Sequence, residues 1–582
     1  MAVRTLDVSN FLNPDQLATT IANYWSEWNS YRAAWLDQKQ ELRNYLFATD
    51  TKTTSNNKLP WSNSTTVPKL TQIRENLHAN LYAALFPNSN WLRWIGNNAQ
   101  ADSEVTRHKV SSYMKGKLRQ QGFEDVVSKQ LYDYIDWGMV IGKVGFTAEM
   151  YQHPSGETIL GYIGPTLSRI SPYDLVLNPV APTYRESPKI IKEIVTIGDL
   201  VRRVKDDPSD IKLAETVAKL QANRSYISTV SEATLRKADG YIADGFASLQ
   251  SYYKSGFCEL LTFYGDLYDS ESGVLYDNAI IRIVDRAYVV SVDKNPSWLG
   301  RDPIHIAGWR PRPDNLYPMG PLDNLVGLQY RMDHLENLRA DVFDQIALPA
   351  LKIRGDVEDF EFGPGARIYL GDEGDVEFLR PEATALQADL QINLLEQRME
   401  DMAGAPRQAL GIRTPGEKTA FEVRTLENNS GRIFQHKTAQ LEREFIEPVV
   451  NSMLEAARRN LNIADTIRVS DETTGISFFT NITPEDLASS GKLVPMGARH
   501  FAERALRVQN LQTAMIFKQI PDVGVHLSGK TIARIVADEL NEPEMFGENI
   551  AVAEQQETAR FVDESQTQLQ LEASIAAEEG VF

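Results

Sequence analysis

The chain has 582 residues, a length at which several structural units are expected rather than one simple core. Hydrophobic residues make up 42% and charged residues 24% of the sequence, which is typical of a soluble globular protein. The formal net charge of −19 argues against a protein that wraps duplex DNA tightly, because such proteins usually present a basic face to the phosphates.

No apolar run approaches the roughly 20 residues that a membrane-spanning helix needs. The N-terminal residues lack the apolar segment of a secretory signal, so we expect synthesis and assembly in a cytoplasm, without a membrane. A single cysteine, Cys258, excludes an intramolecular disulfide and a multi-cysteine zinc site. The eight histidines show no paired spacing, and we expect no metal and no cofactor.

The first part of the chain is predicted to begin with helices. Apolar and aromatic residues recur every three or four positions, which indicates amphipathic helices. The predicted helices are residues 14–47, 68–85 and two helices within 101–137.

Alternating apolar residues and glycine turns then predict a strand-rich region. The predicted strands are 140–150, 158–163, 168–177, 257–268 and 280–292, with helices between about 197 and 220. Because helices and strands form separate blocks, the predicted fold class is α+β, predominantly helical, rather than an alternating βαβ series.

The clearest single helix is predicted at residues 321–346. Pro321 suits the first helical position, and Asp323 suits the positive end of the helix dipole. One apolar stripe follows the helix; it comprises Leu322, Leu325, Leu328, Met332, Leu335, Leu338, Val342 and Ile346.

A compact insert follows this helix, and a second long helix follows the insert. Short strands are predicted in the insert at 351–353, 367–370 and 376–379. After a glycine- and proline-containing loop, a long helical stretch is predicted from Lys418 to about Leu461, with kinks at 428–431 and Pro448. One strand at 476–479 and helices at 498–519, 530–540 and 550–578 complete the chain.

Four blocks of sequence resemble the portal proteins, or head-to-tail connectors, of tailed bacteriophages, particularly those of the podophage type. The first runs from Trp309-Arg-Pro-Arg-Pro-Asp-Asn-Leu-Tyr-Pro-Met-Gly through Pro349 and is similar to the entry into the portal stem. The others are Gly363-Pro-Gly-Ala-Arg-Ile, Met402-Ala-Gly-Ala-Pro-Arg with Leu410-Gly411 and Thr419–Val423, and Gly491-Lys-Leu-Val-Pro-Met-Gly-Ala-Arg-His-Phe-Ala-Glu.

The resemblance implies a portal fold with wing, stem, clip and crown regions. Its layout assigns residues 1–320 to the wing, 321–346 and 384–403 to the stem helices, 347–383 to the clip, 404–418 to the tunnel loop, and 419–582 to a long kinked helix and the crown. Such subunits form a homo-oligomeric ring, a dodecamer, at one capsid vertex of the virion.

The resemblance also implies the partners of that ring. Portal rings contact major capsid and scaffolding proteins, dock the terminase large subunit, pass double-stranded DNA during packaging and ejection, and then bind a tail adaptor or head-completion protein. They are structural proteins, so the chain is not expected to be an enzyme.

Two groups of charged residues are candidate contacts in this layout. Arg407, Arg413 and Lys418 in the tunnel loop are candidates for touching DNA phosphates, with a solvated loop or contacts between subunits as the alternative. The acidic residues of the clip are candidates for a docking surface; they include Asp356, Glu358, Asp359, Asp372 and Glu373.

One motif indicates a different function. Residues 524–531, Gly-Val-His-Leu-Ser-Gly-Lys-Thr, match the GxxxxGK[ST] pattern that cradles phosphates, and would make the chain a nucleotide-dependent DNA-processing enzyme. The residues before the motif indicate a helix, whereas a phosphate loop follows a buried strand. The other interpretation is a loop in which Ser528 caps a helix. A third hypothesis is another oligomeric scaffold or a minor tail component.

Three further groups are interpreted as structural. Trp25, Trp28 and Trp35 have helical spacing and are expected to pack in a core. The pairs Asp133/Asp136 and Asp341/Asp344 could bind a cation, but solvated helix faces are the default expectation. Arg424, Arg432 and Lys437 are expected to pair with Glu422, Glu427 and Glu442.

Overall fold

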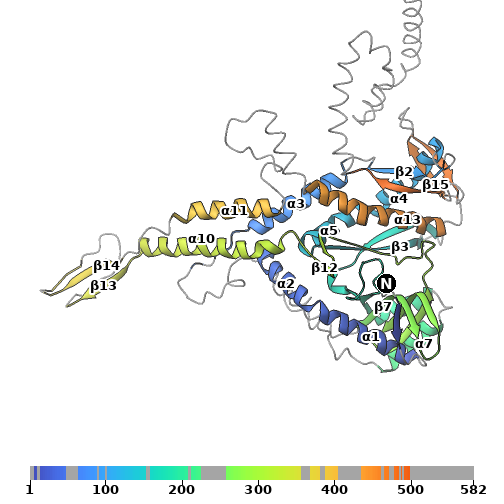
Figure 1. The fold of residues 1–582 in the computed structure, drawn as a ribbon, viewed down its shortest axis with the longest axis horizontal. Coiled ribbons are helices and arrows are strands. Elements are labelled where there is room, and N and C mark those ends of the chain that lie inside the picture. The colour runs from blue at the N-terminus through green and yellow to red at the C-terminus, as the bar shows by residue number, and fades with distance from the viewer. Residues whose placement is uncertain are drawn as a thin grey trace, which may run out of the picture. The chain divides into compact units, whose positions relative to one another are not determined.

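A computed structural model describes about three fifths of the chain (Figure 1). The described residues are 5–8, 14–47, 63, 65–87, 91–98, 101, 103–152, 158–206, 211–223, 257–355, 368–371, 373–379, 387–403, 434–460, 465–470, 477–483, 487 and 490–497.

The chain divides into two compact units. The first comprises Met1–Ala83 and Gly122–Ala456, and the second comprises Ala84–Gln121 and Ala457–Phe582. Helices and antiparallel strands occur in both units, so the fold is mixed α+β, as the sequence predicts.

The largest sheet of the first unit is an antiparallel series of neighbouring strands. Its order is β5 (Leu175–Leu177), β6 (Lys189–Thr196), β7 (Phe257–Asp269), β8 (Leu275–Val284) and β9 (Tyr288–Lys294). β1 (Thr5–Val8) adds a short parallel pairing to the end of β7. The predicted strand 280–292 is two strands, because Asp285 and Arg286 both have positive φ and reverse the chain between β8 and β9.

Helices cover both faces of this sheet. α1 (Pro14–Tyr31) packs Ile21, Trp25 and Trp28 against residues such as Phe263 and Ile281. Side chains of the alternate positions point to the other face, where α6 (Ile197–Asp206) and α7 (Ile211–Asn223) pack. The prediction that the tryptophans of the first helical segment are core residues is confirmed, and Trp35 packs in a neighbouring cluster.

The predicted helix 14–47 is interrupted at Arg32, where α1 ends and α2 (Ala33–Phe47) begins. The Arg32 side chain is fully buried. Its guanidinium donates to the carbonyl oxygens of Pro172, Tyr173 and Leu175 at 2.5, 2.6 and 2.5 Å. The break therefore lets one arginine satisfy two acceptors of a 3-10 turn, η2 (Pro172–Asp174), and the carbonyl oxygen of the first residue of β5.

A second sheet in the same unit has the order β10 (Ile304–Gly308), β3 (Met139–Gln152) and β4 (Thr158–Arg169). α5 (Phe123–Asp136) leads into β3, and α3 (Lys69–Leu85) forms several polar contacts with α5. The hairpin of β11 (Arg310–Arg312) and β12 (Asn315–Met319) follows β10. This hairpin carries the Trp-Arg-Pro-Arg-Pro block of the sequence.

The expectation that Asp133 and Asp136 lie on a solvated face is wrong. Asp133 is buried and accepts from Arg169 on β4. Asp136 accepts from Arg74 on α3 at 2.7 and 2.8 Å. Both carboxylates therefore join α5 to neighbouring elements through bidentate charged hydrogen bonds.

The helical stretch that ends the first unit contains a π-helical segment, η5 (Glu442–Ile446), between residues 434–441 and α13 (Glu447–Asn460). Pro448, where the sequence predicts a kink, follows this segment closely. Proline has no backbone N–H to donate within the helix, and the π-helical segment accommodates that missing hydrogen bond. The predicted pairing of Lys437 with Glu442 is wrong, because Lys437 donates to the Trp309 carbonyl oxygen at 2.5 Å and to Gln440 at 3.2 Å.

The second unit contains α4 (Glu104–Gln121) and two strand pairs. β2 (Leu92–Gly96) pairs with β17 (Gly491–Pro495), and β15 (Asp465–Ser470) pairs with β16 (Ser477–Ile482). The Trp94 side chain is fully buried over Gly491, where an added Cβ would lie 2.4 Å from the indole. Gly491 is therefore required for this pairing. The predicted helices after residue 497 lie outside the described residues.

Among the residues that the structure describes, no helix is long and apolar enough to cross a membrane.

We predict that Arg32→Lys lowers the free energy of unfolding by about 2–4 kcal/mol, because an ammonium group cannot reach all three carbonyl oxygens and leaves buried acceptors unsatisfied. Arg202→Lys is the matched control, since the Arg202 side chain is 77% exposed. Urea denaturation at fixed protein concentration measures both variants. Equal midpoints for the two variants would contradict the role assigned to Arg32.

Candidate assembly interface

The part of the first unit best suited to bind another molecule is a helical arm. It consists of η3 (Asp323–Leu325), α10 (Val326–Ala347), β13 (Ala350–Arg354), β14 (Asp375–Leu379) and α11 (Asp389–Ala403). In Figure 1 the two helices run side by side and the β13–β14 hairpin lies at the end away from η3. The predicted helix 321–346 is confirmed, and the second helix begins a few residues later than predicted.

Polar groups fix the base of the arm. Asp323 accepts from the Lys39 ammonium at 2.5 and 2.6 Å and from the Gly320 backbone N–H at 2.8 Å. Lys39 lies on α2 and is buried, and burial lowers its pKa although Asp323 opposes that shift. The arm therefore starts from a buried charged hydrogen bond to the helical body of the unit.

Two glycines allow the close approach that this base requires. Gly138 has a φ of +70° and joins α5 to β3, and an added Cβ would lie 2.5 Å from the Gly320 nitrogen. An added Cβ on Gly320 would lie 2.9 Å from the Ile135 carbonyl oxygen. The two backbones therefore cross where no side chain fits, which explains the glycine of the Tyr-Pro-Met-Gly segment.

Residues 63 and 65–67, here called the strap, are bound to α10 by side chains that lie four residues apart on the helix. Four residues of an α-helix advance by about 6 Å, and two residues of extended chain advance by about 6.6 Å. Every fourth side chain of a helix can therefore bind every second residue of an extended chain. Asn337 accepts from the Thr65 N–H at 2.7 Å and donates to the Thr65 carbonyl oxygen at 3.0 Å. The same side of α10 supplies Gln329, Asp333 and Asp341 to the strap and to Leu70.

The series of hydrogen bonds between the strap and α10, here called the ladder, corrects the expectation for Asp341 and Asp344. They accept from the Asn63 side chain at 3.0 and 2.8 Å, so they fix the strap rather than form a merely solvated face. Sequence reasoning missed the strap because it followed the apolar stripe of the helix. The available signal was the polar series Gln329, Asp333, Asn337 and Asp341, which repeats every fourth residue.

The second arm helix is also attached through charge. Lys69, the first residue of α3, donates to Glu400 on α11 at 2.6 Å, and both side chains are buried. Further out, Arg339 on α10 pairs with Asp389 on α11. Ion pairs and hydrogen bonds therefore attach the arm to the rest of the unit, together with the buried apolar side chains of its base, such as Met332 and Met399.

Exposed apolar side chains occur along the whole arm, including Tyr330 and Met402 near its base, and the most exposed ones, Leu348 and Leu390, lie toward its tip. On α10, Met332 is buried, Leu338 is 44% exposed and Phe343 is 60% exposed. On α11, Met399 is buried and Leu390 is 80% exposed. Twelve of the 22 large apolar side chains that are exposed among the described residues lie at positions 330–402. The predicted stripe is therefore covered only at its base.

One face of the hairpin at the tip is apolar, and the other carries charged pairs beside Ala350 and Leu379. Leu351 pairs with Phe378 and Ile353 with Val376, and these four side chains share one face because strands alternate. On the other face Lys352 pairs with Glu377 at 2.7 Å, next to Arg354 opposite Asp375. A two-stranded hairpin is marginally stable alone, so the apolar face favours a binding partner.

Most of the predicted site residues lie outside the described residues. Of the five acidic clip residues given above as candidates, only Glu373 is described; it is exposed in the turn before β14, and its carbonyl oxygen lies where a Cβ on Gly355 would clash. Asp356, Glu358, Asp359 and Asp372 are not described, nor are Arg407, Arg413 and Lys418 of the tunnel loop. The phosphate-loop match at 524–531 also lies outside. The predicted strand 367–370 forms a single bridge at Leu370 in its described part.

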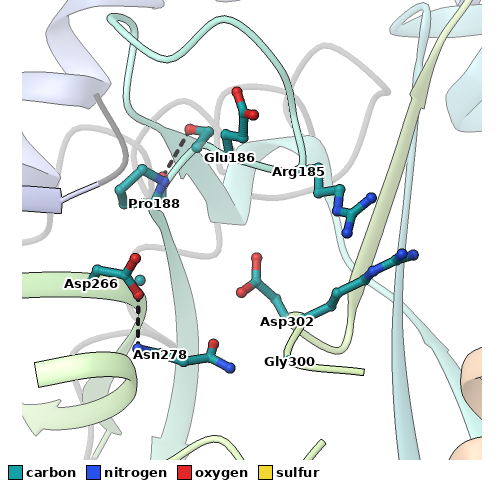
Figure 2. A pocket seen from close by; sticks show the side chains of 10 residues that line it. Arg185, Glu186, Pro188, Asp266, Asn278, Gly300 and Asp302 are labelled. Carbon is teal, nitrogen blue, oxygen red and sulfur yellow. Dashed lines mark hydrogen bonds between the residues drawn. The ribbon is translucent and has the colours of Figure 1, made fainter. Parts of the chain in front are cut away.

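A separate pocket of about 200 Å³ lies between the β5–β6 connection, β7–β8 and the loop before β10 (Figure 2). Several polar side chains of its lining already form hydrogen bonds or ion pairs within the chain. Asp302 accepts from the buried Lys189, and Asp266 accepts from the Asn278 N–H at 2.8 Å. Burial and the nearby Arg185 lower the pKa of Arg301 at the rim. This arrangement indicates no particular reaction, and the arm remains the better candidate.

A comparison with models of known protein families finds no match to this chain, and a comparison with curated proteins finds none. The functional interpretation therefore depends on the resemblance in sequence and on the geometry of the arm.

We predict that Gly138→Ala lowers the free energy of unfolding by about 2–4 kcal/mol, because its Cβ meets backbone atoms at a positive φ. Gly327→Ala is the matched control, because nothing lies within 4 Å of its added Cβ. Since Gly327 lies within α10, this control is expected to stabilise by about 0.5–1 kcal/mol. Chemical denaturation compares the stability of the two variants. An unchanged free energy of unfolding for Gly138→Ala would contradict the close approach of the two backbones at Gly138 and Gly320.

Proposed function

We propose that the chain is the subunit of a portal-type ring at a capsid vertex, through which double-stranded DNA is packaged and ejected. The observation that carries the proposal is the arm. Its two helices and its hairpin leave apolar side chains uncovered toward the tip, while polar side chains hold its base. This is the geometry expected of an element that packs against equivalent arms.

Burial of the uncovered side chains supplies the driving force for association. Covering a large apolar side chain contributes roughly 1.5–3 kcal/mol, and several such side chains lie on each arm. Neighbouring copies related by rotation bury one arm against the next, and a rotation that closes produces a ring. The resemblance to portal proteins favours a ring of twelve copies.

The acidic composition suits a channel for DNA. With a net charge of −19 per chain, the ring repels phosphates overall and favours passage over tight binding. The tunnel loop with Arg407, Arg413 and Lys418 supplies the local contacts to DNA in this proposal.

The clip presents acidic residues to the terminase large subunit, and later to a tail adaptor. Major capsid and scaffolding proteins contact the ring during assembly. The proposed location is the virion, after assembly in a cytoplasm.

The chain itself does not hydrolyse nucleotide in this proposal, since the terminase supplies the energy. The second candidate is a nucleotide-dependent enzyme that uses residues 524–531, and it is favoured only by the match to the phosphate-loop pattern. ATP turnover that is lost in Lys530→Ala would favour that function over the ring.

We predict that Ile353→Asp/Phe378→Asp prevents ring formation, because charges on the apolar face of the hairpin oppose its burial between copies. The matched control is Val274→Asp/Leu275→Asp, which places the same charges on exposed apolar positions at the start of β8. Mass photometry of purified protein measures the oligomer. The arm variant is expected to show only the masses of small species, while the control keeps the mass of the ring. A ring that tolerates both variants equally would refute the assignment of the interface to the arm.

A further inference from the structure

The centre of the contact between the strap and α10 contains an unusual carboxylate. Asp333 is 4% exposed, and its Oδ1 accepts from the Val67 N–H at 3.0 Å and from the Gln329 Nε2 at 2.8 Å. Its Oδ2 is buried without a hydrogen-bond partner among the described residues. The Thr66 hydroxyl of the strap is likewise buried without a partner.

This geometry fits the protonated carboxyl group better than the carboxylate. A proton on Oδ2 removes a buried charge and leaves Oδ1 free to accept both hydrogen bonds. The ionised group instead leaves a charged, buried Oδ2 without a donor among the described residues, which is costly.

The charged groups around Asp333 do not compensate for its burial. Asp333 forms no salt bridge with any described residue, and Lys69 at the end of the strap is engaged by Glu400. Tyr45 on α2 interacts electrostatically with Asp333, and also with Glu41 on α2 and Tyr330 on α10. Burial raises the pKa of Asp333 to about 6, although the hydrogen bonds from Val67 and Gln329 oppose this shift.

We propose that the strap and α10 form a proton-dependent clamp, in which protonation of Asp333 tightens the binding of the strap and its ionisation loosens it. The strap precedes α3, whose Lys69 binds α11, so the clamp controls how firmly both arm helices are held to the body of the unit. The proposal stands independently of ring formation, because every contact in it lies within one chain.

The direction of the pH dependence follows from linkage. The closed clamp binds the proton more tightly than the open strap, in which Asp333 has its ordinary pKa of 3.8. The clamp is therefore most stable below that value and loses stability as the pH rises through about 6. Between pH 8 and pH 5 the closing equilibrium is expected to change roughly tenfold.

Hydrogen–deuterium exchange of the full chain tests the clamp through the peptide that contains Val67 and Leu70, whose amides bind Asp333 and Gln329. After correction for intrinsic exchange rates, the wild-type protection factor is expected to be roughly tenfold higher at pH 5 than at pH 8. Asp333→Asn is expected to give high protection at both pH values, because the amide is neutral and keeps an acceptor oxygen. Asp341→Asn, at the outer end of the same ladder, is the control and is expected to keep the wild-type pH dependence.

A second buried group needs a separate readout. Burial raises the pKa of Asp133 to about 6 as well, and a peptide covering α5 reports its effect independently of the strap. Equal strap protection in the wild-type chain at both pH values would overturn the proposal. A pH-dependent protection of the strap that persists in Asp333→Asn would also overturn the proposal. The wild-type comparison decides the matter even where the Asp333→Asn chain does not fold.

Discussion

The arm depends on polar attachment at its base. The buried hydrogen bond from Lys39 to Asp323 fixes the first turn of the arm against α2, and Gly138 and Gly320 allow the backbones to cross there. Beyond this point the strap and Lys69 hold α10 and α11 through hydrogen bonds. Apolar side chains of the base, such as Leu325 and Met332, are buried beside these groups, whereas Leu338, Phe343 and Leu390 of the outer arm stay exposed.

This division of roles links the structure to assembly. Buried polar pairs are directional and specify one position for the arm, whereas apolar burial is non-directional and supplies most of the free energy of association. The chain uses both at the base of the arm, and we infer that apolar burial also joins the outer arms of neighbouring copies. The hairpin of β13 and β14 follows the same rule on a smaller scale, with an ion pair on one face and four apolar side chains on the other.

The sequence predicts the helices and their apolar faces well, since both follow from local spacing. The helix 321–346 and the core positions of Trp25, Trp28 and Trp35 are correct for this reason. The long-range polar partners are not predictable in the same way. Asp133 and Asp136 find Arg169 and Arg74 on other elements, and β2 pairs with a strand nearly 400 residues away in the chain. The charged loop residues of the proposed site stay predictions, because they lie outside the described residues.

Electron micrographs of the purified wild-type chain test the central claim most directly. The account predicts a closed, rotationally symmetric ring of uniform size with a central bore, in which the arms of neighbouring subunits pack against each other around the axis. Monomers, or compact particles without a bore, at concentrations that favour assembly would contradict it.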